Sequence, residues 1–332
     1  MSAVTDRIRN PLAGLRDAIW HPTPGSLRAL ALFSVIVNAG IIVTGGAVRL
    51  TKSGLGCSTW PKCTPESMIP TPSPDHSPVH MAIEFGNRTL TFLVLGAAVA
   101  VLAAAWRARP RRRDLLWLAA LQPVGVLAQA AWGGLTVLTD LHPAVVAGHF
   151  MLSPVVLIPA VALWVRAGEG DEPVRRLVGG RLRALSLALV GVTAALMVAG
   201  TIVTGTGPHA GDDRAERFSF DIVQVTRVHS LLAWLTVALT VVLLAALWRT
   251  GAPGAVRRRA LELLALELAQ GAIGYVQYFL GVPEVLVALH MLGAAVLWIA
   301  VLRVYFATRT RGPLAVPGAV PAQAEGAVPQ PA

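Results

Sequence analysis

Stretches of apolar residues about as long as a bilayer is thick set the strongest limit on how this chain can fold. A helix of about 20 apolar residues spans the hydrocarbon core and satisfies its own backbone hydrogen bonds there. Of the 332 residues, 55% are hydrophobic and 14% are charged, whereas about a quarter are charged in soluble chains. The sequence therefore predicts an all-α, polytopic membrane protein. We place eight transmembrane helices at 29–49, 85–106, 115–138, 144–165, 183–204, 222–248, 261–280 and 285–306.

Arginines are concentrated in every second connection between these stretches. The basic segments are 1–28, 107–113, 166–183, 249–259 and 303–311. Because cytoplasmic segments carry the excess of arginine and lysine, both termini are predicted to lie in the cytoplasm. This topology accounts for the net charge of +10, so we expect no nucleic acid as a partner. We also expect no cleaved signal peptide, since the first apolar stretch is long enough to remain as a helix.

An internal repeat relates the two halves of the chain. Gln129 to Gly133, followed by His149, recurs 141 residues later as Gln270 to Gly274, followed by His290. With four spans each, both halves run the same way through the membrane, as two four-helix bundles related by a pseudo-two-fold axis along the membrane normal. The expected parts are a cytoplasmic segment 1–28, an N-terminal half 29–165 with an outer loop 50–83, a cytoplasmic linker 166–182, a C-terminal half 183–306 and a disordered cytoplasmic tail 307–332.

Three histidines occupy positions that the repeat places near the outer face. His149 and His290 hold equivalent places on the fourth helix of each half, and His229 lies on the second helix of the C-terminal half. A membrane histidine that is hydrogen-bonded to a neighbouring helix is the simpler interpretation of any one of them. Three of them placed by a repeat favour axial haem ligation, with His229 and His290 on one six-coordinate iron suited to electron transfer. Zinc is disfavoured, because the histidines lie on separate helices without nearby Cys or Asp clusters.

The N-terminal half differs at the position equivalent to His229, which is Asn87. Because asparagine is a poor iron ligand, His149 opposite Asn87 predicts a five-coordinate iron with an open face. Glu84 lies three residues before Asn87, on the same helix face. It is a candidate for relaying protons or stabilising developing positive charge. The alternative is a purely structural Glu84–Arg88 ion pair at the water interface.

Two cysteines and two arginines complete the candidate site residues. Cys57 and Cys63 lie in the first outer loop, which faces an oxidising compartment where a disulfide persists. A structural disulfide and a labile redox pair are both compatible with this spacing. Arg49 and Arg227 lie near the outer ends of their helices, where each is a candidate either for binding a haem propionate or for reaching lipid headgroups.

The segment from Gly45 to Cys57, continuing through Trp60-Pro61 to Cys63, resembles the first helix and outer loop of haem A synthases. The start of the second helix at Glu84-Phe85, the paired histidines and the eight-span plan resemble that family too, over about residues 30–306. The resemblance implies oxidation of the C8 methyl of haem O to a formyl group by successive hydroxylations, giving haem A for cytochrome oxidase.

The resemblance also implies roles for individual residues. The family's haem b ligands correspond to His229 and His290. Its substrate haem corresponds to the half that carries Glu84 and His149, with Asn87 and Arg88 beside them. The family's outer-loop cysteine pair falls on Cys57 and Cys63. The implied setting is a bacterial plasma membrane, with haem O as the substrate, haem O synthase and an electron donor as partners, and a homo-oligomer as a compatible state.

The sequence departs from the family where a histidine commonly follows the acid by three residues, since Asn87 stands there. Either His149 alone holds the substrate iron, or His80 completes the site, or the chain has lost the reaction; the intact loop motif favours the first. A non-catalytic membrane cytochrome is the alternative function. A transporter is the third class, but its polar residues would gather near the midplane rather than at the outer edge.

Overall fold

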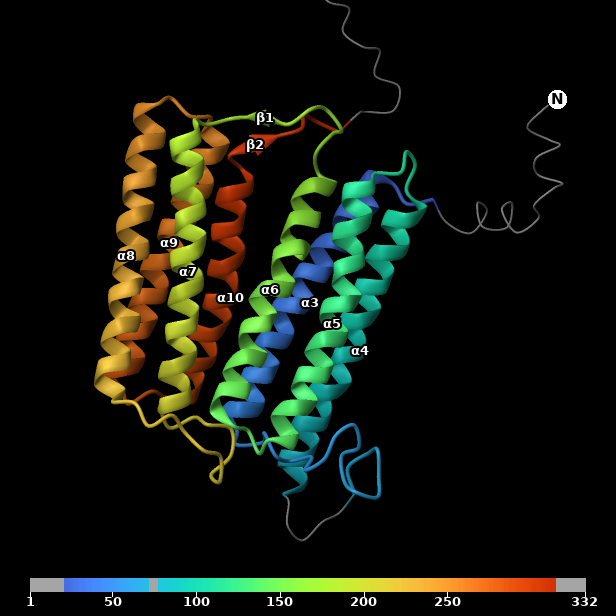
Figure 1. Cartoon of the computed structure of the whole chain (residues 1–332), viewed down its shortest axis with the longest axis vertical. Helices are drawn as coiled ribbons and strands as arrows, with labels where there is room; N and C mark the ends of the chain where they lie inside the picture. The colour runs from blue at the N-terminus through green and yellow to red at the C-terminus, as the bar shows by residue number, and fades with distance from the viewer. Residues whose placement is uncertain (1–20, 72–76, 315–332) are drawn as a thin grey trace, which may run out of the picture.

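The computed structural model describes residues 21–71 and 77–314. Eight long helices and two short strands make up this part of the chain (Figure 1). The elements are α3 (Pro24–Leu50), α4 (Pro78–Arg107), α5 (Arg113–Leu138), α6 (Pro143–Ala167), β1 (Arg175–Arg176), α7 (Gly180–Thr206), α8 (Ile222–Arg249), α9 (Gly254–Phe279), α10 (Glu284–Phe306) and β2 (Arg309–Thr310).

Seven of these helices are long and apolar enough to cross a membrane. The prediction of a helical, multi-pass membrane protein is therefore confirmed. The remaining helix, α9, is also 26 residues long, but three arginines near its start and the acids Glu262 and Glu267 lower its apolar character. It nevertheless packs against α8 and α10 along the bundle, in the place predicted for the seventh span.

All the described helices except α8 start earlier than the apolar stretches indicated, and in α3 and α4 a proline in the first turn accompanies this extension into a polar flank. Proline is favoured in the first turn of a helix, where its missing N–H leaves no bond unmade. At the start of α3, Thr23 Oγ1 accepts the backbone N–H of Ser26 at 3.1 Å, which completes an N-cap before Pro24. In α4, Ser77 and Pro78 play the corresponding part without a side-chain cap. The first outer loop is consequently shorter than the predicted 50–83.

The helices form two bundles that stand side by side, α3–α6 and α7–α10 (Figure 1). Their interface is made by α3 and α6 on one side and by α7 and α10 on the other. Trp298 of α10 donates its indole N–H to the carbonyl of Pro154 in α6 at 2.9 Å across this interface. The interface is close packed, since a Cβ on Gly46 of α3 would lie 2.6 Å from the Cε of Met291 in α10.

Two connections that the sequence repeat equates have the same backbone conformation. Asp140 and Leu141, between α5 and α6, have φ of 49° and 60°, and Gly281 and Val282, between α9 and α10, have φ of 76° and 56°. The Leu141 N–H donates to Thr136 at 2.9 Å, and the Val282 N–H donates to Gln277 at 2.7 Å. Left-handed conformations are uncommon for residues other than glycine, so this match supports the repeat.

The bundles have a loop face and a strand face at opposite ends (Figure 1). On the loop face, the segment after α3 packs against the segment between α7 and α8: the Gly54 N–H donates to the Gly211 carbonyl at 2.9 Å, and Lys52 forms an ion pair with Asp213 at 2.6 Å. These connections bridge the two halves, which the sequence did not indicate.

On the strand face, the linker between the bundles pairs with the segment that follows α10. The strands β1 and β2 are antiparallel, with Arg175 opposite Thr310 and Arg176 opposite Arg309. The predicted tail 307–332 is thus ordered over its first residues, because backbone hydrogen bonds to the linker hold it. The expectation of disorder over that part was wrong, and 315–332 lie outside the described residues.

Candidate functional site

The imidazole rings of His229 in α8 and His290 in α10 face each other inside the C-terminal bundle. Their ring centres are 6.3 Å apart and the ring planes are inclined at 71°. The Nδ1 of His229 lies 3.2 Å from the Leu196 carbonyl of α7. Because a carbonyl oxygen only accepts hydrogen bonds, Nδ1 must be the donor. That bond fixes the tautomer, so the unprotonated nitrogen of His229 is Nε2.

This spacing fits two imidazoles bound to opposite sides of one metal ion. An imidazole nitrogen lies about 2 Å from a bound metal, so two such rings have centres about 6 Å apart. The Nδ1 of His290 is buried and has no hydrogen-bond partner among the described residues. The donor set is two neutral imidazoles and no carboxylate, as in a six-coordinate haem. The pair therefore fits a haem group, which His229 and His290 would hold between α8 and α10.

The N-terminal bundle brings Asn87 of α4 and His149 of α6 to the equivalent positions. The Thr44 hydroxyl of α3 donates to Oδ1 of Asn87 at 2.8 Å, which orients the amide. The side-chain amide of Gln129 lies 3.0 Å from Nδ1 of His149. The His149 ring is therefore oriented by a neighbour on α5, and Asn87 is tied to α3.

Each of these four side chains packs against a glycine of a neighbouring helix. A Cβ on Gly200 would lie 3.1 Å from Cε1 of His229, closer than nearly all such contacts. Replacing that glycine would push the imidazole away from its place. The pairs are Gly45 with Asn87, Gly133 with His149, Gly200 with His229 and Gly274 with His290.

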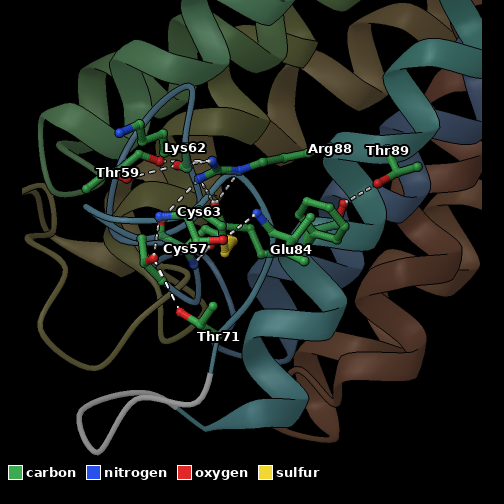
Figure 2. Close-up of a disulfide and its surroundings, with 12 residues drawn as sticks. Cys57, Thr59, Lys62, Cys63, Thr71, Glu84, Arg88 and Thr89 are labelled. Atoms are coloured by element: carbon green, nitrogen blue, oxygen red, sulfur yellow. Dashed lines mark hydrogen bonds and ion pairs between the residues drawn. A yellow bond between two sulfur atoms is a disulfide. The ribbon is translucent and has the colours of Figure 1, made fainter.

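Glu84 is buried at the start of α4, with 5% of its surface exposed, and both of its carboxylate oxygens are engaged (Figure 2). Oε1 accepts hydrogen bonds from Nε of Arg88 at 3.1 Å and from Nη2 at 2.5 Å. Oε2 accepts the backbone N–H of Cys57. The ion pair proposed as the structural alternative therefore forms, and it also includes the outer loop.

The loop between α3 and α4 closes over this pair through a disulfide and Arg88 (Figure 2). Cys57 and Cys63 are disulfide-bonded, with their Cα atoms 4.3 Å apart, so the predicted disulfide is confirmed. The guanidinium of Arg88 donates to the carbonyls of Cys57 at 3.0 Å, Thr59 at 2.9 Å and Lys62 at 3.1 Å. The sequence indicated the Glu84–Arg88 pair and the cysteines separately; their joining into one network required the fold.

Arg49 connects the two halves on the loop face. Its Nε donates to the His209 carbonyl, and its Nη2 donates to the Thr204 carbonyl at 3.1 Å. Two of its five N–H groups thus donate hydrogen bonds to carbonyls of the C-terminal half. Arg227, by contrast, is exposed near the start of α8. Propionate binding by these two arginines stays a prediction, with a bridging role now evident for Arg49.

His80 lies in the first turn of α4, one turn before Glu84, and lines a small pocket between the two long outer segments. Lys52, Asp212 and Asp213 line the same pocket. The ammonium of Lys52 beside Asp213 holds the pKa of that carboxyl below its usual value. The surroundings of His80 are therefore polar and charged.

The fold and these sites define a multi-pass membrane protein with half-buried, paired imidazole and amide positions in two helical bundles. A family model described as a cytochrome oxidase assembly protein, COX15-CtaA, matches residues 28–302. The chain belongs to that family, and the resemblance found in the sequence is confirmed.

Individual relatives named heme A synthase are similar to the chain. The protein from Halalkalibacterium halodurans is 32% identical over 151 residues, covering 44% of this chain and 49% of the relative. That from Alkalihalophilus pseudofirmus is 31% identical over 147 residues, covering 43% and 48%. The chain thus spans about half the length of these two relatives. The protein from Methylorubrum extorquens is 28% identical over 322 residues, covering 80% and 82%.

Proposed function

We propose that this protein is a haem A synthase, an oxidoreductase that oxidises the C8 methyl of haem O to a formyl group by successive hydroxylations. The observation that carries the proposal is the asymmetry between the halves: two facing imidazoles in one, and His149 with Asn87 in the other. Family membership and the names of the relatives support it. The product, haem A, serves cytochrome oxidase.

The C-terminal half is the electron-transfer side in this proposal. His229 and His290 hold haem b, which supplies one-electron transfer when bound. The ring separation of 6.3 Å supports this assignment. The Leu196 carbonyl accepts a hydrogen bond from Nδ1 of His229, which would leave Nε2 to bind the haem iron.

The N-terminal half is the substrate side. His149 holds the iron of haem O from one side, and Asn87 leaves the other side without a protein ligand. Glu84 lies one turn away on the face of α4 that carries Asn87, where its carboxylate stabilises positive charge that develops on the substrate. The bonds from Arg88 and the Cys57 N–H hold that carboxylate in place. Preorganised charge of this kind is a large contribution to catalysis in many enzymes.

The same proposal includes the topology and the partners. All eight helices span a bacterial plasma membrane, the strand face is cytoplasmic, the two termini are likewise assigned to the cytoplasm, and the halves 29–165 and 183–306 are related by a pseudo-two-fold axis. The arginines of the strand face support this orientation. An electron donor and haem O synthase are the expected partners, and a homo-oligomer is a compatible state.

The test is expression in a host that makes haem O but lacks its own haem A synthase. Haems extracted from the purified protein and from the membranes are then identified by mass. Haem A formed only when the chain is present supports the proposal. If haem b is bound but haem O is not converted, the proposal is rejected in favour of the second candidate, a non-catalytic membrane cytochrome. Asn87, in place of a usual histidine, is the feature that favours that candidate.

A further inference from the structure

A buried carboxylate lies deep in the C-terminal bundle, away from the site described above. Glu267 of α9 has 6% of its surface exposed. Its Oε1 accepts a hydrogen bond from the Thr240 hydroxyl of α8 at 2.8 Å, while its Oε2 is buried and has no hydrogen-bond partner among the described residues. Acidic residues inside membrane bundles are costly and mark proton or ion pathways.

Glu267 lies on the strand-face side of the pair of imidazoles. It precedes Gly274, which packs against His290, by seven residues, so it lies about 10 Å closer to the strand face along the helix. Thr236 follows His229 by seven residues and is buried at a similar depth on α8. A polar layer therefore lies about two helical turns from the site, toward the strand face.

The charged and titratable groups of the neighbouring helices lie at other depths. His229 and His290 are nearer the loop face, and Glu262 and Arg303 are nearer the strand face, so none of them is paired with Glu267 in the described part of the chain. The groups on the three helices are Arg227, His229 and Arg249 on α8, Arg257, Arg258, Arg259, Glu262, Tyr275 and Tyr278 on α9, and Glu284, His290, Arg303 and Tyr305 on α10.

The N-terminal bundle has apolar residues at the positions equivalent to Glu267 and Thr236. Val126 occupies the position of Glu267 at the repeat offset of 141, and Val94 occupies that of Thr236 at the offset of 142. Both valines are buried in one apolar cluster. Packing at this depth is therefore satisfied by valine in one copy of the bundle, so packing alone does not explain an acid in the other.

We propose that Glu267 is a proton-binding site coupled to the oxidation state of the haem held by His229 and His290. The inference rests on the proposed haem b assignment. When a one-electron donor would reduce the ferric iron, the Glu267 carboxylate binds one proton from the strand face. Oxidation of the iron releases the electron and that proton. No covalent bond to the haem changes. The added electron favours the proton because charges in a bundle interior are weakly screened.

The test is a redox titration of haem b in the purified full-length protein at several pH values across neutrality. A tenfold change in proton concentration shifts a one-electron potential by at most about 59 mV for one coupled proton. The wild type should become harder to reduce as pH rises. E267Q and E267V should keep the low-spin spectrum but lose most of that pH dependence. E267V reproduces the residue of the N-terminal half.

The matched control is E262Q on the same helix, which removes a carboxylate that is paired with Arg259. It should leave the pH dependence unchanged. Redox-difference infrared spectra give a second measurement, in which a carboxylic acid band should be present in the wild type and absent in E267Q. Equal pH dependence in wild type and E267Q would overturn the inference while leaving the haem assignment intact. A wild type without low-spin haem would overturn the proposed function and this inference together.

Discussion

The carboxylate of Glu84 accepts the backbone N–H of Cys57, so the acid of α4 and the disulfide loop before it form one unit. Arg88 completes the unit by binding Glu84 and three loop carbonyls. A buried disulfide on the loop face and a buried acid in α4 thus belong to one hydrogen-bonded network. The catalytic role proposed for Glu84 and its structural role use the same contacts, and they have to be separated by substitution.

Replacing Glu84 with glutamine should stop haem A formation while haem b stays bound. Glutamine keeps the size of the side chain and can still accept the Cys57 N–H, but it lacks the negative charge. We expect haem A formation to fall by about 100-fold or more, measured by mass analysis of extracted haems. The low-spin haem b spectrum checks folding. Undiminished haem A would reject the catalytic role.

His229→Ala and His290→Ala should each remove the low-spin haem b spectrum, because one imidazole cannot make a six-coordinate iron. His149→Ala is the matched control, since it changes the equivalent helix of the other half and should leave that spectrum unchanged. Absorption spectra of the purified variants give the answer. Retention of low-spin haem b in both C-terminal variants would exclude the assignment.

Asn87→His should close the open side of the substrate iron. A second pair of facing imidazoles, at the position equivalent to His229, should convert that haem to a low-spin form that no longer binds carbon monoxide. Thr44→Val is the control, because it removes the hydroxyl that orients Asn87 without adding a ligand. Carbon monoxide binding that is unaffected by the histidine would show that Asn87 does not face the iron.

Arg49→Met should destabilise the contact between the halves. The variant leaves the carbonyls of His209 and Thr204 without their donor, at a cost of about 1–3 kcal/mol. Lys52→Met removes an exposed ion pair between the same two segments and should change stability by less than about 0.5 kcal/mol. Thermal unfolding in detergent compares the two. Equal effects would mean that Arg49 does not hold the halves together.

Local signals in the sequence predicted the helices well, and their ends less well. The apolar stretch that begins at residue 85 marks the apolar part of α4, but the helix starts at Pro78, in a polar flank that a first-turn proline allows to be helical. Apolar character reports burial in lipid, whereas a helix ends where its backbone hydrogen bonds end. The two need not coincide.

Contacts between distant segments could not be predicted. Nothing in the sequence near Arg49 indicates that its partners are carbonyls about 160 residues later. The pairing of Glu84 with the Cys57 N–H likewise depends on how the loop folds over α4. Glu267, however, was accessible to sequence reasoning, because aligning the two halves places it opposite Val126.

The strand pair on the strand face has a consequence for how such a chain can arise. β1 and β2 bring the beginning and end of the C-terminal half together. In the N-terminal half, Gly168 just after α6 lies against the side chain of Arg28 near the start of α3. The chain therefore enters and leaves each half at nearby points on the strand face. A unit of this shape can be copied in tandem with only a short connection, and afterwards each copy can change its interior independently.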